Sequence, residues 1–199
     1  MTFHLRKIIF LLGFFWVNAI NASSSSCSVN QGFLSKQHIV EALQNVVLDS
    51  RINPALRFQS MIAILENRLE ITPPMKNSFL EILKSSHGAS RDRLKALKFL
   101  ISDESIKKNV IDLLFQLASK RTAKMRWLAV AQNMDGIDGR EQRAQALNLE
   151  DTIRFNAAEL FKQNSSTADV ERMQSLCQTF TQGTINPEIR SQAIAKLCQ

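Results

Sequence analysis

The chain has 199 residues, of which 45% are hydrophobic and 22% are charged, and its formal net charge at pH 7 is +7. This composition is typical of a globular protein whose length allows one hydrophobic core. The chain contains no Tyr and only six Gly and four Pro. Because it is rich in Leu, Ala, Gln and Lys instead, the composition favours helices and argues against a strand-dominated fold.

The first 22 residues have the three-part pattern of a secretory signal peptide. A basic start is followed by an apolar run over residues 8–17 and by small residues at Ala19 and Ala22. The run is shorter than the ~20 residues that a membrane-spanning helix needs. We therefore expect cleavage of residues 1–22 after Ala22 and export to the periplasm or beyond the cell. An uncleaved anchor or a buried helix is the alternative interpretation.

Cleavage would leave a short leader and one folded domain. Residues 23–33 are polar, so we expect a flexible leader there, followed by a helical domain over residues 34–199. Cys27 lies in the leader, but Ser24 occupies the position three residues before it, where lipid attachment prefers Leu. The pattern therefore favours a soluble mature protein over a lipid-anchored one.

Positive charge is concentrated in a central segment, which we call the basic belt. Residues 84–126 contain eleven basic and four acidic residues, whereas residues 127–199 contain seven basic and nine acidic ones. A basic surface attracts nucleic acid, an anionic membrane surface or an acidic protein, and export disfavours nucleic acid. Alternatively, the charges only solvate the outer faces of helices. The basic members of the belt are Lys84, Arg91, Arg93, Lys95, Lys98, Lys107, Lys108, Lys120, Arg121, Lys124 and Arg126.

Apolar residues recur at helical spacing along the whole domain and predict ten helices. The expected helices lie near residues 34–47, 54–69, 74–87, 91–101, 104–118, 123–134, 143–147, 149–161, 167–182 and 187–197. Polar residues with short side chains precede most of them and predict N-terminal caps. The expected caps are Asn53, Ser90, Asp103, Thr122, Asn148, Ser166 and Asn186, while Thr72, Pro73 and Pro74 separate the second helix from the third.

Five of the expected helices begin with the same pattern, an Arg followed by small and apolar residues. The arginines are 36, 33, 28 and 36 residues apart, at Arg57, Arg93, Arg126, Arg154 and Arg190. The pattern resembles HEAT-type repeats, in which antiparallel helix pairs stack into a solenoid. The resemblance implies an all-α solenoid of about five pairs, with the arginines as structural residues; a compact helical bundle and a ligand-binding arginine row are the alternatives.

No motif predicts a cofactor, a metal site or a catalytic centre. His38 and His87 have no second ligand at a metal-binding spacing. Glu41, Glu81 and Glu141 are candidates for the single acid of a cell-wall hydrolase, but Glu is common on exposed helix faces. Asp135, Asp138 and Glu141 have the chemistry of a calcium loop without its spacing, so a turn between repeats is the preferred interpretation.

The three cysteines test the expected architecture. If the last helix pair turns near Thr184, Cys198 lies about 9 Å along the helix axis beyond the residue that faces Cys177. This estimate argues against a Cys177–Cys198 disulfide. A Cys27–Cys198 disulfide would require the ends of the chain to meet in a closed bundle, so an extended stack predicts an unpaired thiol or an intermolecular bond.

We expect an exported module that binds another protein, with an acidic surface, through its second helices and the basic belt. Trp127 is the preferred contact, because Trp and Arg dominate interface energies, although it could equally pack between repeats. An immunity protein that neutralises a toxin is the nearest alternative; a cell-wall hydrolase and a host-directed effector are others. The expected partner-binding residues are Lys120, Arg121, Lys124, Arg126 and Trp127.

Overall fold

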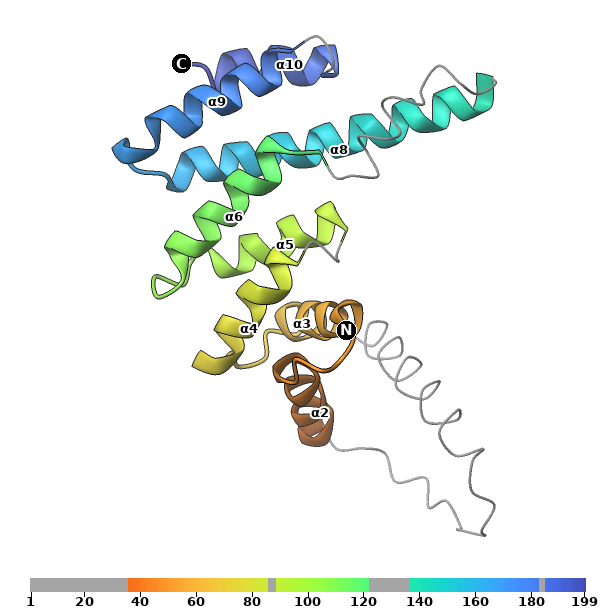
Figure 1. The fold of residues 1–199 in the computed structure, drawn as a ribbon, viewed down its shortest axis with the longest axis vertical. Helices are drawn as coiled ribbons and strands as arrows, with labels where there is room; N and C mark the ends of the chain where they lie inside the picture. The colour runs from red at the N-terminus through yellow and green to blue at the C-terminus, as the bar shows by residue number, and fades with distance from the viewer. Residues whose placement is uncertain (1–35, 86–88, 122–136, 183–184) are drawn as a thin grey trace.

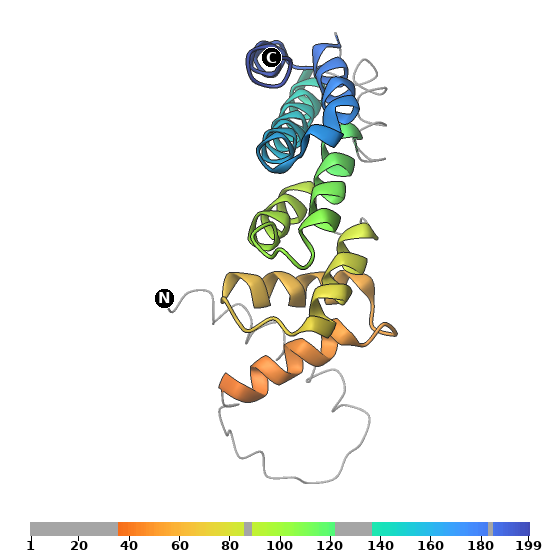
Figure 2. The same ribbon diagram turned by 90° about the vertical axis from the view of Figure 1, so that its left-hand side faces the viewer.

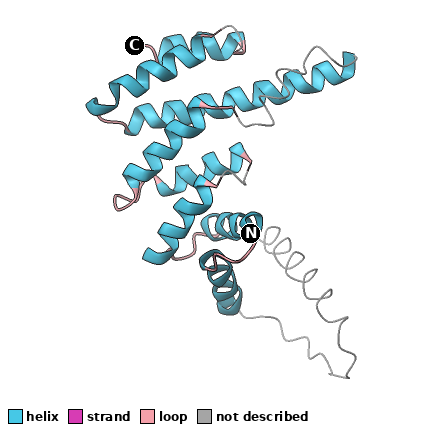
Figure 3. Cartoon of the chain, in the orientation of Figure 1, coloured by secondary structure: helices cyan, strands magenta, loops and turns pink. Residues whose placement is uncertain are grey.

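The computed structural model describes residues 36–85, 89–121, 137–182 and 185–199. Within these ranges the chain is all-α and contains no strand, as the sequence predicted (Figures 1 and 3). The elements are α2 (Lys36–Leu48), α3 (Pro54–Glu66), α4 (Pro73–Lys84), α5 (Ser90–Leu100), α6 (Lys107–Ser119), α8 (Ile137–Asn164), the short 3₁₀ helix η2 (Thr167–Asp169), α9 (Val170–Thr181) and α10 (Pro187–Lys196). The expected signal peptide, the leader and the helix near residues 123–134 lie outside the described residues.

The two Asn-Pro pairs begin helices as expected. The Asn53 side chain accepts from Ala55 N at 2.8 Å, and the Asn186 side chain accepts from Glu188 N at 2.9 Å. Pro follows at the first position of each helix, where no backbone N–H is needed. Ser166, another expected cap, forms a capping box with Asp169, although the helix there starts with η2.

Two other expected caps are wrong because the side chains have tertiary or turn partners. Ser90 lies inside α5, after Ala89, and its buried hydroxyl donates to Glu150 Oε1 of α8 at 3.1 Å. Asp103 accepts from Ser105 N at 3.1 Å in a turn, and α6 begins only at Lys107. The position of Ser90 or Asp103 just before an apolar segment does not distinguish a helix cap from a residue with a tertiary or turn partner.

The expected break near Asn148 is also wrong, because α8 runs without interruption from Ile137 to Asn164. Asn148 does not cap a new helix: its side-chain oxygen accepts from Asn186 Nδ2 at 3.1 Å.

The end of α3 also differs from the expectation. Helix α3 ends at Glu66 rather than near Leu69, and two residues later Arg68 adopts a positive φ of 51°.

The helices form two layers that follow chain order (Figures 1 and 2). In the first layer α2, α4, α6 and α9 contact one another in succession, and in the second layer α3, α5, α8 and α10 do the same. Helices α2 and α10 therefore lie at opposite ends of the stack (Figure 1). This order is the one that stacked helix pairs require, and the assignment to HEAT-type repeats remains a prediction.

One continuous hydrophobic core runs through the described helices. Met61, Phe79, Leu113, Phe155 and Phe180 are among its fully buried side chains, and they come from both layers. Each such side chain contributes roughly 1.5–3 kcal/mol by leaving water. Among the described helices, none combines the length and apolar character needed to cross a bilayer.

Cys177 and Cys198 form a disulfide, which corrects the expectation that they lie too far apart. Their Cα atoms are 5.2 Å apart. The estimate failed because it continued the α10 axis as far as Cys198, whereas α10 ends at Lys196. Cys198 therefore does not continue along the axis of α10; its N–H folds back to Ala193 O at 3.2 Å. Cys27 lies outside the described residues.

Breaking this disulfide should destabilise the C-terminal pair. The bond spans a sequence separation of 21 residues, and closing a loop of that length removes entropy from the unfolded chain worth about 3 kcal/mol. The double variant Cys177→Ser, Cys198→Ser should lose about that much free energy of unfolding, measured by urea denaturation. Cys27→Ser is the matched control and should unfold like the wild type. Equal stability of the double variant and the wild type would contradict the assignment.

Candidate binding surface

Three arginines of the second layer reach the C-terminal ends of first-layer helices. All three are at most 8% exposed. The carbonyl groups in the last turn of a helix receive no hydrogen bond from within that helix. A donor from another helix can bond them and thereby hold the two helices together. The bonds, each 3.0 Å long, join Arg57 Nε to Val47 O, Arg93 Nη2 to Leu83 O, and Arg154 Nε to Ala118 O.

The other two arginines of the repeat pattern differ. Arg190 Nη2 donates to Ile185 O at 3.3 Å, just before α10, so its bond is local. Arg126 lies outside the described residues. In the described part of the chain, the arginine that bonds the end of α6 is Arg154 of α8.

The outer side of α5 carries a basic face, which we call the α5 face. It consists of Arg91, Lys95, Lys98 and Phe99, which are all exposed, with Phe99 41% accessible. Their spacing of four, three and one residues places them on one side of a helix. The opposite side buries Arg93, Leu94, Leu97 and Leu100. The core side of α5 thus fixes the direction in which the α5 face points.

The α5 face was not predicted from the sequence, where the basic belt was taken as one feature. The structure divides the belt into internal and external charges. Arg93 and Arg121 bond other elements internally, whereas Lys98, Lys108 and Lys120 are exposed. The helical spacing of Arg91, Lys95, Lys98 and Phe99, opposite an apolar stripe, was the signal that could have identified the face.

Asp151 joins two arginines in a buried ion-pair cluster beside the end of α6. Arg121 Nη2 lies 2.8 Å from Asp151 Oδ2, and Arg154 Nη1 lies 3.2 Å from Asp151 Oδ1. The Asp151 side chain is 2% exposed and the Arg121 side chain 13%. Burial lowers the pKa of the Arg154 guanidinium, and the Asp151 charge opposes that shift. Buried Glu150 opposes the shift as well, so Arg154 is charge-balanced by more than one carboxylate, of which Asp151 is the one that bonds it directly.

The expected partner-binding residues are only partly within the described chain. Lys120 is exposed just after α6, as a binding residue must be. Arg121 instead bonds Asp151 through both Nε and Nη2. Lys124, Arg126 and Trp127 lie outside the described residues.

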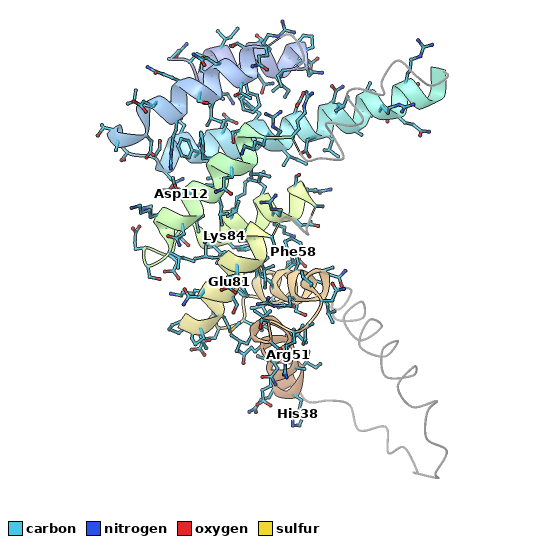
Figure 4. The ribbon with its side chains drawn as sticks, viewed as in Figure 1. His38, Arg51, Phe58, Glu81, Lys84 and Asp112 are labelled. Carbon is cyan, nitrogen blue, oxygen red and sulfur yellow. A yellow bond between two sulfur atoms is a disulfide. The ribbon has the colours of Figure 1, made fainter. Side chains whose placement is uncertain are left out.

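The residues considered for enzyme or metal chemistry lie on outer surfaces or outside the described chain. Glu41, Glu81 and Glu141 are exposed on α2, α4 and α8, and Figure 4 shows Glu81 on the same helix as Lys84. In the described ranges, no group of three His, Cys, Asp or Glu is placed to hold a metal ion. His87 and the side chains of Asp135 and Asp138 lie outside those residues.

Removing one interlayer arginine tests its structural role. Arg93→Met keeps most of the buried stem but leaves Leu83 O without its donor, so the free energy of unfolding should fall by about 1–3 kcal/mol. Arg91→Met, on the exposed side of the same helix, is the matched control and should change stability by less than about 0.5 kcal/mol. Urea denaturation measures both. Equal effects of the two substitutions would show that the bond to Leu83 does not support the fold.

The buried cluster makes a second prediction about stability. Asp151→Asn leaves Arg121 and Arg154 near one another without their carboxylate, and breaking a buried pair in this way costs about 3–5 kcal/mol. Asp112 is the control: it bonds Arg172 at 2.7 Å, with both side chains about two-fifths exposed, and Figure 4 shows it on α6. Asp112→Asn should cost less than about 1 kcal/mol. A loss for Asp151→Asn no larger than for Asp112→Asn would contradict the account.

Comparison with known proteins gives no family to which this chain could be assigned. No family model, curated protein or solved structure matches it significantly. A function for the chain must therefore be argued from its own surface, and from the division between buried and exposed charges.

Proposed function

We propose that this chain is an exported protein-binding module that binds an acidic surface of another protein on its α5 face. The observation that carries the proposal is the exposure of three basic side chains and Phe99 on one side of a helix whose other side is fixed in the core. A helix whose other side is packed in the core presents these positions at a constant spacing, so its backbone does not have to be ordered on binding.

The composition of the α5 face supports a protein partner. Phe99 is one of few large apolar side chains that remain exposed among the described residues. Aromatic side chains supply much of the energy at interfaces, while surrounding cations steer an acidic partner and set its orientation. Arg91 and Lys98 take part in no ion pair within the described part of the chain, so binding would not have to break one.

The ion pair that Lys95 of the α5 face forms does not compete strongly with a partner. Lys95 Nζ lies 2.6 Å from Glu66 Oε1 of α3, with side chains 49% and 36% exposed. An exposed pair of this kind contributes less than about 1 kcal/mol. An acidic partner can therefore attract Lys95 as well.

The Cys177–Cys198 disulfide supports the exported part of the proposal. Disulfides persist in oxidising compartments and are rare in the reducing cytosol. This agrees with the signal-peptide pattern of residues 1–22. An immunity protein remains the nearest alternative within the same class, and a single toxin as the obligate partner would identify it.

A capture experiment with matched charge reversals tests the proposal. The chain from residue 23 to residue 199, immobilised by a tag, should retain one stoichiometric protein from the envelope fraction of its source cells, less of it as salt rises. The double variant Arg91→Glu, Lys98→Glu should reduce that retention at least tenfold, because it reverses the charge of the α5 face.

The control changes the net charge by the same amount elsewhere. Lys108 and Arg140 are exposed on α6 and α8, so Lys108→Glu, Arg140→Glu should retain the partner like the wild type. Equal loss in both double variants would mean that net charge, and not the α5 face, determines binding. A wild-type chain that retains no specific protein would argue against a binding module.

A further inference from the structure

The Cys177–Cys198 disulfide lies at an open cavity of about 520 Å³ beside α9. Both cysteines line the cavity, together with apolar residues such as Met173 and Leu197. Cys198 is exposed, whereas Cys177 is half-buried. Access is one of the factors that decide how fast a thiol attacks a disulfide. The cavity includes no residue of the α5 face, so an inference from it stands apart from the proposed function.

The end of α10 is also held to α8 by contacts that do not involve the disulfide. Lys162 Nζ donates to Lys196 O at 2.6 Å and to Gln199 O at 3.2 Å. Lys196 Nζ in turn lies 2.8 Å from Glu159 Oε1, and Leu197 is buried in the core. The disulfide is therefore an additional link, from α9 to the segment after α10, and α10 has other contacts with the stack if that link opens.

The position of Cys198 allows the bond to open without loss of a helix. Helix α10 ends at Lys196, so Cys198 lies in the segment that follows the helix. A small movement of this segment separates the two sulfurs and leaves the hydrogen bonds within α9 and α10 in place. Such local openings cost less free energy than global unfolding. The disulfide can therefore react while the rest of the chain stays folded.

We propose that the Cys177–Cys198 disulfide is a thiol–disulfide exchange site, which a dithiol protein reduces in the folded chain by attack on Cys198 Sγ. Cys198 is the expected point of attack because it is the more exposed of the two residues. Exchange switches the C-terminal helix pair between a cross-linked form and an open form. Exposed disulfides are more often labile or regulatory than buried structural ones.

The exchange proceeds in two steps that conserve atoms and electrons. A thiolate of the dithiol protein attacks Cys198 Sγ, the bond to Cys177 breaks, and Cys177 Sγ leaves as a thiolate that takes up a proton. The second thiol of the dithiol protein then loses its proton and attacks the sulfur bonded to Cys198, so that Cys198 Sγ leaves and is protonated. The two cysteines are reduced to thiols, and the dithiol is oxidised to a disulfide.

Reduction kinetics of the Cys27→Ser chain test whether the bond opens in the folded state, since this variant contains only the paired cysteines. Dithiothreitol should reduce the bond at a rate proportional to its concentration and at least tenfold faster than the chain unfolds in water, a rate obtained by extrapolating unfolding in urea. The reduced chain should keep its helical circular dichroism, as should the matched variant Cys177→Ser, Cys198→Ser. Reduction no faster than unfolding, or loss of the helical signal on reduction, overturns the proposal.

Trapping of the mixed disulfide tests the attacked sulfur and the class of partner. The probe is a thioredoxin-type protein whose second active-site Cys is replaced by Ser, so that it cannot complete the second step. After free thiols are alkylated, mass spectrometry of the peptides should find the probe joined to Cys198 and the alkyl group on Cys177. A probe joined mainly to Cys177 overturns the assignment of Cys198. A chain that dithiothreitol reduces but that never joins the probe overturns the assignment of a dithiol protein as partner.

Discussion

The arrangement of this chain depends on the bonds between second-layer arginines and the C-terminal carbonyls of first-layer helices. A helix that ends inside a protein leaves carbonyl groups that water does not reach, and each needs a donor. Arg meets this need over a long reach, because its charge persists on burial and its guanidinium carries several N–H groups. Arg57, Arg93 and Arg154 each fill that role at a different level of the stack.

This use of arginine explains why the basic belt has two kinds of members. Arg93 is 8% exposed and bonds Leu83, whereas Arg91, only two residues earlier, lies at the surface. The buried member helps to set the orientation of α5, and the exposed members on its other side then point away from the core. Some basic residues of the belt, such as Arg93, thus bond other helices inside the fold, whereas others, such as Arg91, lie at the surface where a partner could contact them.

The periodicity of apolar residues predicted the all-α fold, because a spacing of about 3.6 residues is a local property of each helix. Asn53 and Asn186 were also predictable, since capping by Asn before Pro involves only neighbouring residues. Ser90 and Asn148 were not, because their partners Glu150 and Asn186 are 60 and 38 residues away. Sequence spacing contains no information on such contacts.

The residues of the candidate surface were also only partly predictable, because some of their contacts are with residues far away in the sequence. The helical spacing of the α5 face is visible in the sequence, but the exclusion of Arg93 from it follows only from its bond to Leu83. Arg121 looked like an available cation, and its pairing with Asp151, 30 residues later, was not predictable. The Cys177–Cys198 disulfide escaped prediction for a related reason, since a straight-helix estimate ignored the end of α10 at Lys196.

The central claim is that the chain meets its partner at the α5 face, and site-specific photo-crosslinking tests it most directly. A benzoylphenylalanine introduced at position 99 is compared with one at position 194, where Ile194 of α10 is 52% exposed. The account predicts a single discrete adduct from position 99 in the envelope of source cells and none from position 194. An adduct from position 194, with none from position 99, would contradict it.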